Sequence, residues 1–204
     1  AKMRRAQEAV ESARPYASKM VEVIEELVGR VDEDAHPLLQ APEEQSHALV
    51  ILITSSRGLC GGFNANLLRK LDRFIDDRLE IYDSMHFLTI GRKGQQHVNK
   101  REDVEVLENY EGINGAVSFA GARAVAQRAM SMFTAGEVDT VYLVFNEFVS
   151  AIQTEQNLRQ LLPLSGDGVK VGEAKATAAG EDYIYEPSEA ALLAQLLPNS
   201  VEVQ

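Results

Sequence analysis

The stretch Ala48-Leu49-Val50-Ile51-Leu52-Ile53, followed by Thr54-Ser55-Ser56-Arg57-Gly58-Leu59-Cys60-Gly61-Gly62-Phe63-Asn64, decides the fold. Six consecutive apolar residues predict a strand that is covered on both faces. The glycine-rich turn then leads into Asn64–Leu79, where leucine, isoleucine and phenylalanine recur on one helical face. A buried strand, a tight turn and an amphipathic helix are the opening of an alternating β/α domain.

The same alternation continues along the chain. Further strands are predicted at Phe87–Ile90, Val104–Leu107 and Val141–Phe145, and further helices at Lys93–Arg101 and Ser118–Thr134. Phe148–Leu162 shows no helical stripe and is expected to return as an antiparallel strand. Right-handed crossovers between such strands give an α/β fold, a Rossmann-like three-layer domain with a mostly parallel sheet and helices on both faces.

The end of the chain carries weaker signals. The glycine-rich stretch Gly166–Gly180 predicts a loop, and Tyr183–Tyr185 predicts a short edge strand. Pro187 and Ser188 then open a last amphipathic helix over Glu189–Leu197, which we expect to end at Pro198.

The first thirty residues carry apolar or small side chains at alternating spacings of three and four. This period of 3.5 keeps one narrow stripe towards a partner helix and predicts a long coiled-coil helix. The stripe consists of Met3, Ala6, Val10, Ala13, Ala17, Met20, Ile24, Leu27 and Val31. An amphipathic helix packed on its own domain is the alternative. Because no other segment has a comparable heptad run, we expect the stripe to lack a partner within this chain.

Composition excludes several classes of protein. The 204 residues are 45% hydrophobic and 25% charged, as in a folded globular protein. A net charge of −11 argues against nucleic acid as a partner, because phosphate binding needs a cationic face. A single cysteine excludes an internal disulfide framework and a multi-cysteine zinc site. No apolar run approaches the roughly 18 residues of a membrane-spanning helix, so direct membrane insertion is not expected.

The glycine-rich loop is the first candidate for chemistry, because open α/β sheets bind phosphates where a helix begins after a strand. Its Gly58, Gly61 and Gly62 do not have the spacing of a dinucleotide fingerprint, and no Walker Gly-Lys-Ser/Thr follows them. Three glycines are equally expected where a backbone turns sharply. Nucleotide binding at 58–62 therefore remains the alternative to a structural turn.

Other candidate residues are weaker still. Cys60 lies near a helix N-terminus, but the four histidines are scattered, so we expect a packed residue rather than a nucleophile. The histidines show no ligand spacing, and no metal site or cofactor is predicted. Gly91-Arg92-Lys93-Gly94 reads as a helix-entry turn, with a cationic phosphate hook as the alternative.

Taken together, several of these stretches resemble the gamma subunit of the F-type ATP synthase. The stretches that carry the resemblance are Lys2-Met3-Arg4-Arg5-Ala6-Gln7, Ala13-Arg14-Pro15-Tyr16-Ala17, Ser56–Asn64, Ile90–Gly94, Val141–Asn146, Gln160–Leu164, Tyr183-Ile184-Tyr185-Glu186-Pro187 and Ala191-Leu192-Leu193. They occur in the family's order and cover essentially the whole chain.

The resemblance implies a rotor without catalytic residues of its own. In this family the N- and C-terminal helices form a coiled coil in the bore of the catalytic alpha/beta hexamer. The α/β domain holds the epsilon subunit and rests on the membrane ring of c subunits, which turns as protons flow. The implied location is peripheral, on the cytoplasmic face of a bacterial inner membrane.

The resemblance also implies particular regions and residues. It places a contact with the membrane ring at Tyr183, Tyr185 and Glu186. It divides the chain into a shaft helix at 1–31, an acidic, proline-punctuated linker at 32–47, the α/β domain at 48–198 and the start of a C-terminal helix at 199–204. By the same resemblance the family's chain begins about twenty residues earlier and continues beyond Gln204, where the stripe would find its partner helix. A nucleotide-dependent enzyme and a coiled-coil adaptor are the alternatives.

Overall fold

The computed structural model divides the chain into two compact units, Ala1–Gln40 with Leu164–Gln204, and Ala41–Pro163, which are described separately. The residues that the structure describes are 12, 15–16, 19–20, 22–24, 27, 36–58, 60–110, 119–150, 153–164, 196–198 and 201. None of the described helices is long and apolar enough to cross a membrane.

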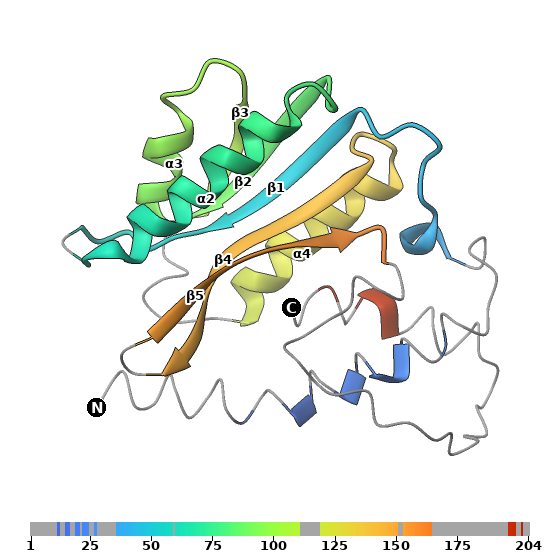
Figure 1. The fold of residues 1–204 in the computed structure, drawn as a ribbon. Helices are drawn as coiled ribbons and strands as arrows, with labels where there is room; N and C mark the ends of the chain where they lie inside the picture. The colour runs from blue at the N-terminus through green and yellow to red at the C-terminus, as the bar shows by residue number, and fades with distance from the viewer. Residues whose placement is uncertain are drawn as a thin grey trace. The chain divides into compact units, whose positions relative to one another are not determined.

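The larger unit is built on a five-stranded sheet in the order β3-β2-β1-β4-β5 (Figure 1). Its strands are β1 (His47–Ile53), β2 (Ser84–Ile90), β3 (Glu105–Tyr110), β4 (Thr140–Ser150) and β5 (Gln153–Leu162). The first four strands pair in parallel, and β4 with β5 is the antiparallel pair. The predicted mixed α/β sheet with mostly parallel strands is therefore confirmed, including the returning strand β5.

Helices lie on both faces of this sheet (Figure 1). They are α2 (Gly62–Arg78), α3 (Arg92–Val98) and α4 (Phe119–Thr134). On one face, Leu67 and Leu71 of α2 are fully buried against Val50 and Leu52 of β1 and their neighbours. Burying a leucine side chain contributes roughly 2 kcal/mol, so this apolar face fixes α2 on the sheet. On the other face α4 contacts β4 and buries residues such as Ala129.

Two predicted boundaries shift for physical reasons. The helix predicted at Lys93–Arg101 begins at Arg92 and ends at Val98, because Asn99 caps it with its backbone N–H on Gln95 and His97. The strand predicted at Val141–Phe145 runs on to Ser150, since β5 pairs with it beyond the part that β1 contacts. Residues 148–150, predicted to open the returning strand, therefore belong to β4, and β5 begins at Gln153.

The smaller unit contains the described part of the predicted coiled-coil stripe. Met20, Ile24 and Leu27 are buried, whereas Tyr16 and Lys19 are exposed, so these three stripe residues lie on a covered face. The expectation that the stripe is uncovered in this chain is wrong at these three positions, because the chain itself covers them. The other stripe residues, Met3, Ala6, Val10, Ala13, Ala17 and Val31, lie outside the described residues.

The last described segment of the chain is also in this smaller unit. Leu197 and Val201 are buried, and Leu196, Leu197, Pro198 and Val201 are helical. The prediction that the helix ends at Pro198 is therefore wrong. A proline inside a helix removes one N–H donor and its ring crowds the carbonyl four residues before it, at a cost of roughly 3 kcal/mol, and the burial of Leu197 and Val201 on either side offsets part of that cost.

Candidate functional site

The glycine-rich loop lies at the carboxyl end of β1, the central strand. The chain runs outwards from β1 to β3 and returns on the other side of β1 as β4, so the order of strands reverses between β1 and β4. Open α/β sheets bind ligands in the crevice at such a point. The contacts of this loop therefore decide whether the α/β domain holds a ligand-binding site.

The side chain of Asn64 closes the loop from inside. Its Oδ1 accepts the backbone N–H of Ser55 at 3.0 Å, and its Nδ2 donates to the backbone oxygen of Arg57 at 3.3 Å. From the neighbouring strand, Asn146 Nδ2 donates to the backbone oxygen of Phe63 at 3.0 Å. Asn64 therefore holds the loop to itself, using the N–H of Ser55 as a donor, and Asn146 holds the loop to β4.

Two further amides of the loop are also used locally. The backbone N–H of Arg57 donates to Ser55 Oγ at 3.0 Å, and that of Phe63 donates to the Cys60 oxygen at 3.2 Å. Gly61 caps α2 with a φ of 56°, a conformation that favours glycine. The loop thus has the contacts of a structural turn from strand to helix.

The second loop at this edge packs directly on the first strand. Gly91 has a φ of 102°, and a Cβ there would lie 2.2 Å from the backbone oxygen of Thr54. The buried Thr54 Oγ1 accepts the N–H of Gly94 at 2.8 Å. Gly91 is the N-cap of α3, which confirms the helix-entry reading of Gly91-Arg92-Lys93-Gly94.

Cys60 has no catalytic surroundings among the described residues. The expectation that Cys60 is packed is wrong, because its side chain is exposed, and its thiol lies 3.1 Å from the backbone oxygen of Arg57. The four histidines make their hydrogen bonds elsewhere: His36 with Leu38, His47 and His86 with Ser84, and His97 with Asp72. Within the described part of the chain, no group of three or more His, Cys, Asp or Glu residues is arranged to hold a metal ion.

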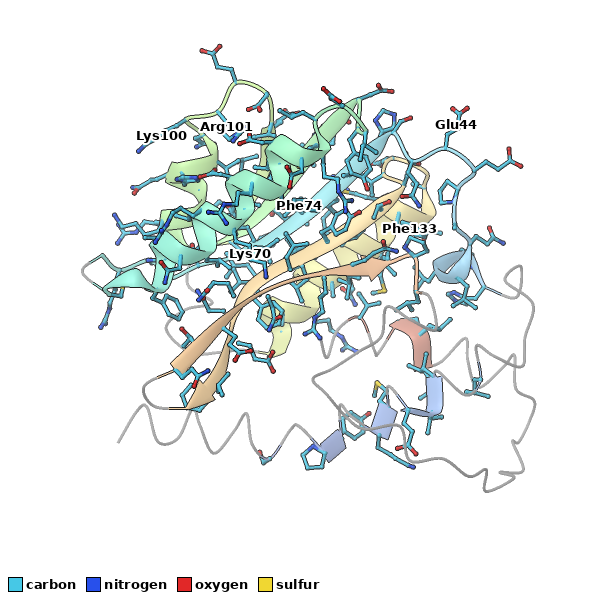
Figure 2. The ribbon with its side chains drawn as sticks, in the orientation of Figure 1. Glu44, Lys70, Phe74, Lys100, Arg101 and Phe133 are labelled. Carbon is cyan, nitrogen blue, oxygen red and sulfur yellow. The ribbon has the colours of Figure 1, made fainter. Side chains whose placement is uncertain are left out.

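Charges on α2 and on the segment that follows α3 form one network. Arg101 contacts Asp103 at 2.6 Å and Asp76 at 2.7 Å, and it lies just beyond α3 (Figure 2). The hydrogen bond to Asp103 is the main reason why the pKa of Arg101 is raised and that of Asp103 is lowered. Exposed ion pairs of this kind contribute at most about 1 kcal/mol each, so their role is to join the two helices.

On the opposite side of α2, Lys70 Nζ donates to the backbone oxygen of Gln156 in β5 at 2.6 Å. Lys70 and Phe74 lie one helical turn apart on α2 (Figure 2). Phe74 packs edge-on against Tyr142 of β4, with ring centroids 4.9 Å apart. These contacts fix the helix that follows the glycine-rich loop.

The predicted ring contact cannot be placed on this structure. Tyr183, Tyr185 and Glu186 lie outside the described residues, as do Gly166–Gly180. Their roles stay predictions.

Comparison with known proteins decides the family. The model of the ATP-synt family, described as ATP synthase, matches residues 1–204. A relative from Anaeromyxobacter dehalogenans, named ATP synthase gamma chain, is 42% identical over 207 residues, which cover all of this chain and 69% of the relative. This chain belongs to the ATP synthase gamma-chain family. Relatives of the same name from Geotalea uraniireducens and Chlorobaculum tepidum are 42% and 40% identical, and the matches cover 68% and 69% of their lengths.

Solved structures share the fold of this gamma-chain family member. The match to the central stalk and c-ring structure of Tetrahymena thermophila mitochondrial ATP synthase has a TM-score of 0.62 at 20% identity, covering 99% of this chain and 83% of that chain. The rotor of Euglena gracilis mitochondrial ATP synthase matches with a TM-score of 0.50 at 19% identity, covering 98% and 81%.

The family confirms the central predictions from sequence. The chain is a non-catalytic rotor subunit of the ATP synthase central stalk, as its relatives indicate. The internal closure of the glycine-rich loop agrees with that identity. Sequence reasoning missed the role of Asn64 and the meeting of His47 with His86, because neither is part of a local periodic pattern.

Proposed function

We propose that this chain couples proton flow through a membrane ring to ATP synthesis and hydrolysis in an alpha/beta hexamer. The single observation that carries the proposal is the gamma-chain match over the full length of the chain. The burial of Met20, Ile24 and Leu27 on one helical face supports a shaft helix that packs along this stripe. In this proposal the chain is peripheral, on the cytoplasmic face of a bacterial inner membrane.

The proposed partners are the alpha/beta hexamer, the epsilon subunit and the c-subunit ring. We assign 1–31 to the shaft, 32–47 to the connection, 48–198 to the α/β domain and 199–204 to the start of the second shaft helix. Within the α/β domain the epsilon subunit binds, and Tyr183, Tyr185 and Glu186 contact the ring. The acidic net charge is compatible with membrane association, since attachment runs through protein rather than through anionic lipid.

A binding titration of the full chain with the epsilon subunit of Geotalea uraniireducens ATP synthase, whose gamma chain is 42% identical to this chain, tests the proposal. We expect a 1:1 complex of micromolar affinity or better, on the order of −8 kcal/mol. Three exposed apolar positions, Ile81, Leu107 and Val149, allow Asp substitutions that test the α/β surface without emptying the core. A folded chain that fails to bind epsilon, and also fails to bind when extended to the full length of its relatives, contradicts the proposal.

The ring contact has its own experiment. Pull-down of this chain by purified c-ring should weaken when Tyr183 and Tyr185 become alanine and Glu186 becomes glutamine. Glu189→Gln is the matched control, since it removes a nearby charge that the proposal does not use. Equal retention by all variants would remove these three residues from the interface.

The nucleotide-dependent enzyme makes a different prediction. It requires ATP or a dinucleotide to bind at the glycine-rich loop, and Gly61→Val to abolish that binding, because valine does not adopt the φ of 56° found there. The contacts of Asn64 and Asn146 argue against this function.

A further inference from the structure

His47 and His86 lie on neighbouring parallel strands at the amino edge of the sheet. The register pairs His47 of β1 with Ser84 of β2, and Leu49 with His86. Side chains two residues apart on a strand share a face, so Ser84 and His86 project on the same side as His47. Thirty-eight residues of intervening sequence separate the two histidines, yet the sheet brings them to diagonal positions.

Both imidazole rings are directed at one oxygen atom. His47 Nδ1 lies 2.8 Å from Ser84 Oγ, and His86 Nε2 lies 3.3 Å from the same atom. Two ring nitrogens from different strands therefore converge on one small volume, which a hydroxyl group occupies. Neutral imidazole nitrogens are the most common protein ligands of transition metals.

The other nitrogen of His86 faces a carboxylate. His86 Nδ1 lies 3.3 Å from Glu105 Oε2 of β3, close enough for an ion pair but not aligned as a hydrogen bond. A histidine that binds a metal usually directs its second ring nitrogen to such a carboxylate, which orients the ring. The side chains of His86 and Glu105 are 25% and 68% exposed.

We propose that His47 and His86 form a two-histidine binding site for a divalent transition-metal ion, with Glu105 as the carboxylate behind His86. The ion takes the place of the Ser84 hydroxyl between the two rings, and water completes its coordination. Imidazole nitrogen suits copper, nickel and zinc, and the general order of affinities puts Cu²⁺ first. Two protein ligands make this an exchangeable site, distinct from a closed structural site with four.

Titration of the full chain with Cu²⁺ alone at neutral pH tests the site. Calorimetry should give one ion per chain, and electron paramagnetic resonance should show coordination by two imidazole nitrogens. His47→Gln and His86→Gln should each weaken binding at least about tenfold, and Glu105→Gln should weaken it less. His97→Gln is the matched control, because His97 lies on α3 and contacts Asp72 instead.

A further variant tests the site without removing a ligand, in case a histidine variant does not fold. Ser84→Ala keeps both imidazoles and removes only the hydroxyl between them, so Cu²⁺ affinity should be unchanged or higher. Circular dichroism identifies any variant that does not fold. In that case the electron paramagnetic resonance spectrum of the wild-type chain alone tests whether two imidazole nitrogens bind the ion. No saturable binding, coordination by fewer than two imidazoles, or equal affinity in folded His86→Gln would overturn the proposal.

Discussion

The two edges of the parallel sheet are held by different kinds of contact. At the carboxyl edge, backbone packs on backbone: Gly91 and Gly94 let the start of α3 reach Thr54 at the end of β1. At the amino edge, a side chain joins two strands, because Asp139 Oδ2 accepts the N–H groups of Ser46 at 2.9 Å and His47 at 2.8 Å. Substitution at the carboxyl edge is therefore limited by space, and at the amino edge by hydrogen bonding.

At the amino edge, backbone hydrogen bonds of Ser46 and His47 join the starts of β1, β2 and β4. The backbone oxygen of Ser46 accepts the N–H groups of Asp83 and Ser84, just before and at the start of β2. The N–H of Asp139, just before β4, donates to the backbone oxygen of His47 at 2.8 Å. These bonds fix the register of β1 against both of its neighbours.

The largest effect is expected at the carboxyl edge. In Gly91→Ala the new Cβ would overlap the Thr54 oxygen, and the positive φ adds strain, so we expect a loss of more than about 4 kcal/mol in unfolding free energy. Gly136→Ala is the control: its φ of 71° is also positive, but a Cβ there meets nothing within 4 Å, so only about 1 kcal/mol is lost. Urea unfolding measures both. Equal losses would mean that space does not limit this edge.

At the amino edge we expect Asp139→Ala to cost about 2 kcal/mol, because the N–H groups of Ser46 and His47 lose their acceptor. Asp139→Asn keeps an acceptor oxygen and should recover part of that loss. The control Asp77→Ala, exposed on α2, should stay within about 0.5 kcal/mol of the wild type. Thermal unfolding at neutral pH separates these cases, and an Asp139→Ala chain as stable as the control would contradict the assigned role.

The smallest effect concerns alkaline pH. Burial raises the pKa of Tyr142 to about 12, the hydrogen bond between the Tyr142 and Tyr82 hydroxyls adds to this, and Arg78 opposes it. Since the pKa in the unfolded chain is about 10, the folded state holds this proton more tightly, and stability should fall as pH rises from about 10 to 12.

Tyr142→Phe should flatten this alkaline loss of stability. Tyr16→Phe, at a side chain that is 62% exposed, should leave the slope unchanged. Burial also raises the pKa of Tyr110, at the end of β3, to about 12. Tyr110 therefore adds to the same loss of stability at alkaline pH. Denaturant unfolding across this pH range measures both variants, and a slope in Tyr142→Phe equal to that of the wild type would rule out Tyr142 as a contributor.

The elements of the α/β unit followed from local patterns. The apolar run of β1 and the leucine face of α2 each need only their own residues to be recognised, because a strand between two layers and a helix on a sheet impose different apolar periods. The returning strand β5 was predictable for a related reason, since its segment lacks a helical stripe. Boundaries were less predictable, because the length of β4 depends on its pairing with β5.

The candidate site was likewise predictable from the sequence only in part. The glycines of both loops were visible in the sequence, and a structural turn was among the readings. Whether the first loop was open or closed depended on Asn64 and on Asn146, which lies eighty-two positions further along the chain. The helix through Pro198 was mispredicted because a proline stop is a statistical signal, which tertiary packing overrides.

The sequence by itself determined the alternating α/β class and the gamma-type family, because these properties depend on local spacing and on the order of motifs. Only the tertiary structure decided that His47 meets His86 at Ser84, and that Asp139 joins the starts of β1 and β4. Parallel strands are joined by long crossovers, so their register is set by the packing of helices on the sheet and not by neighbouring residues.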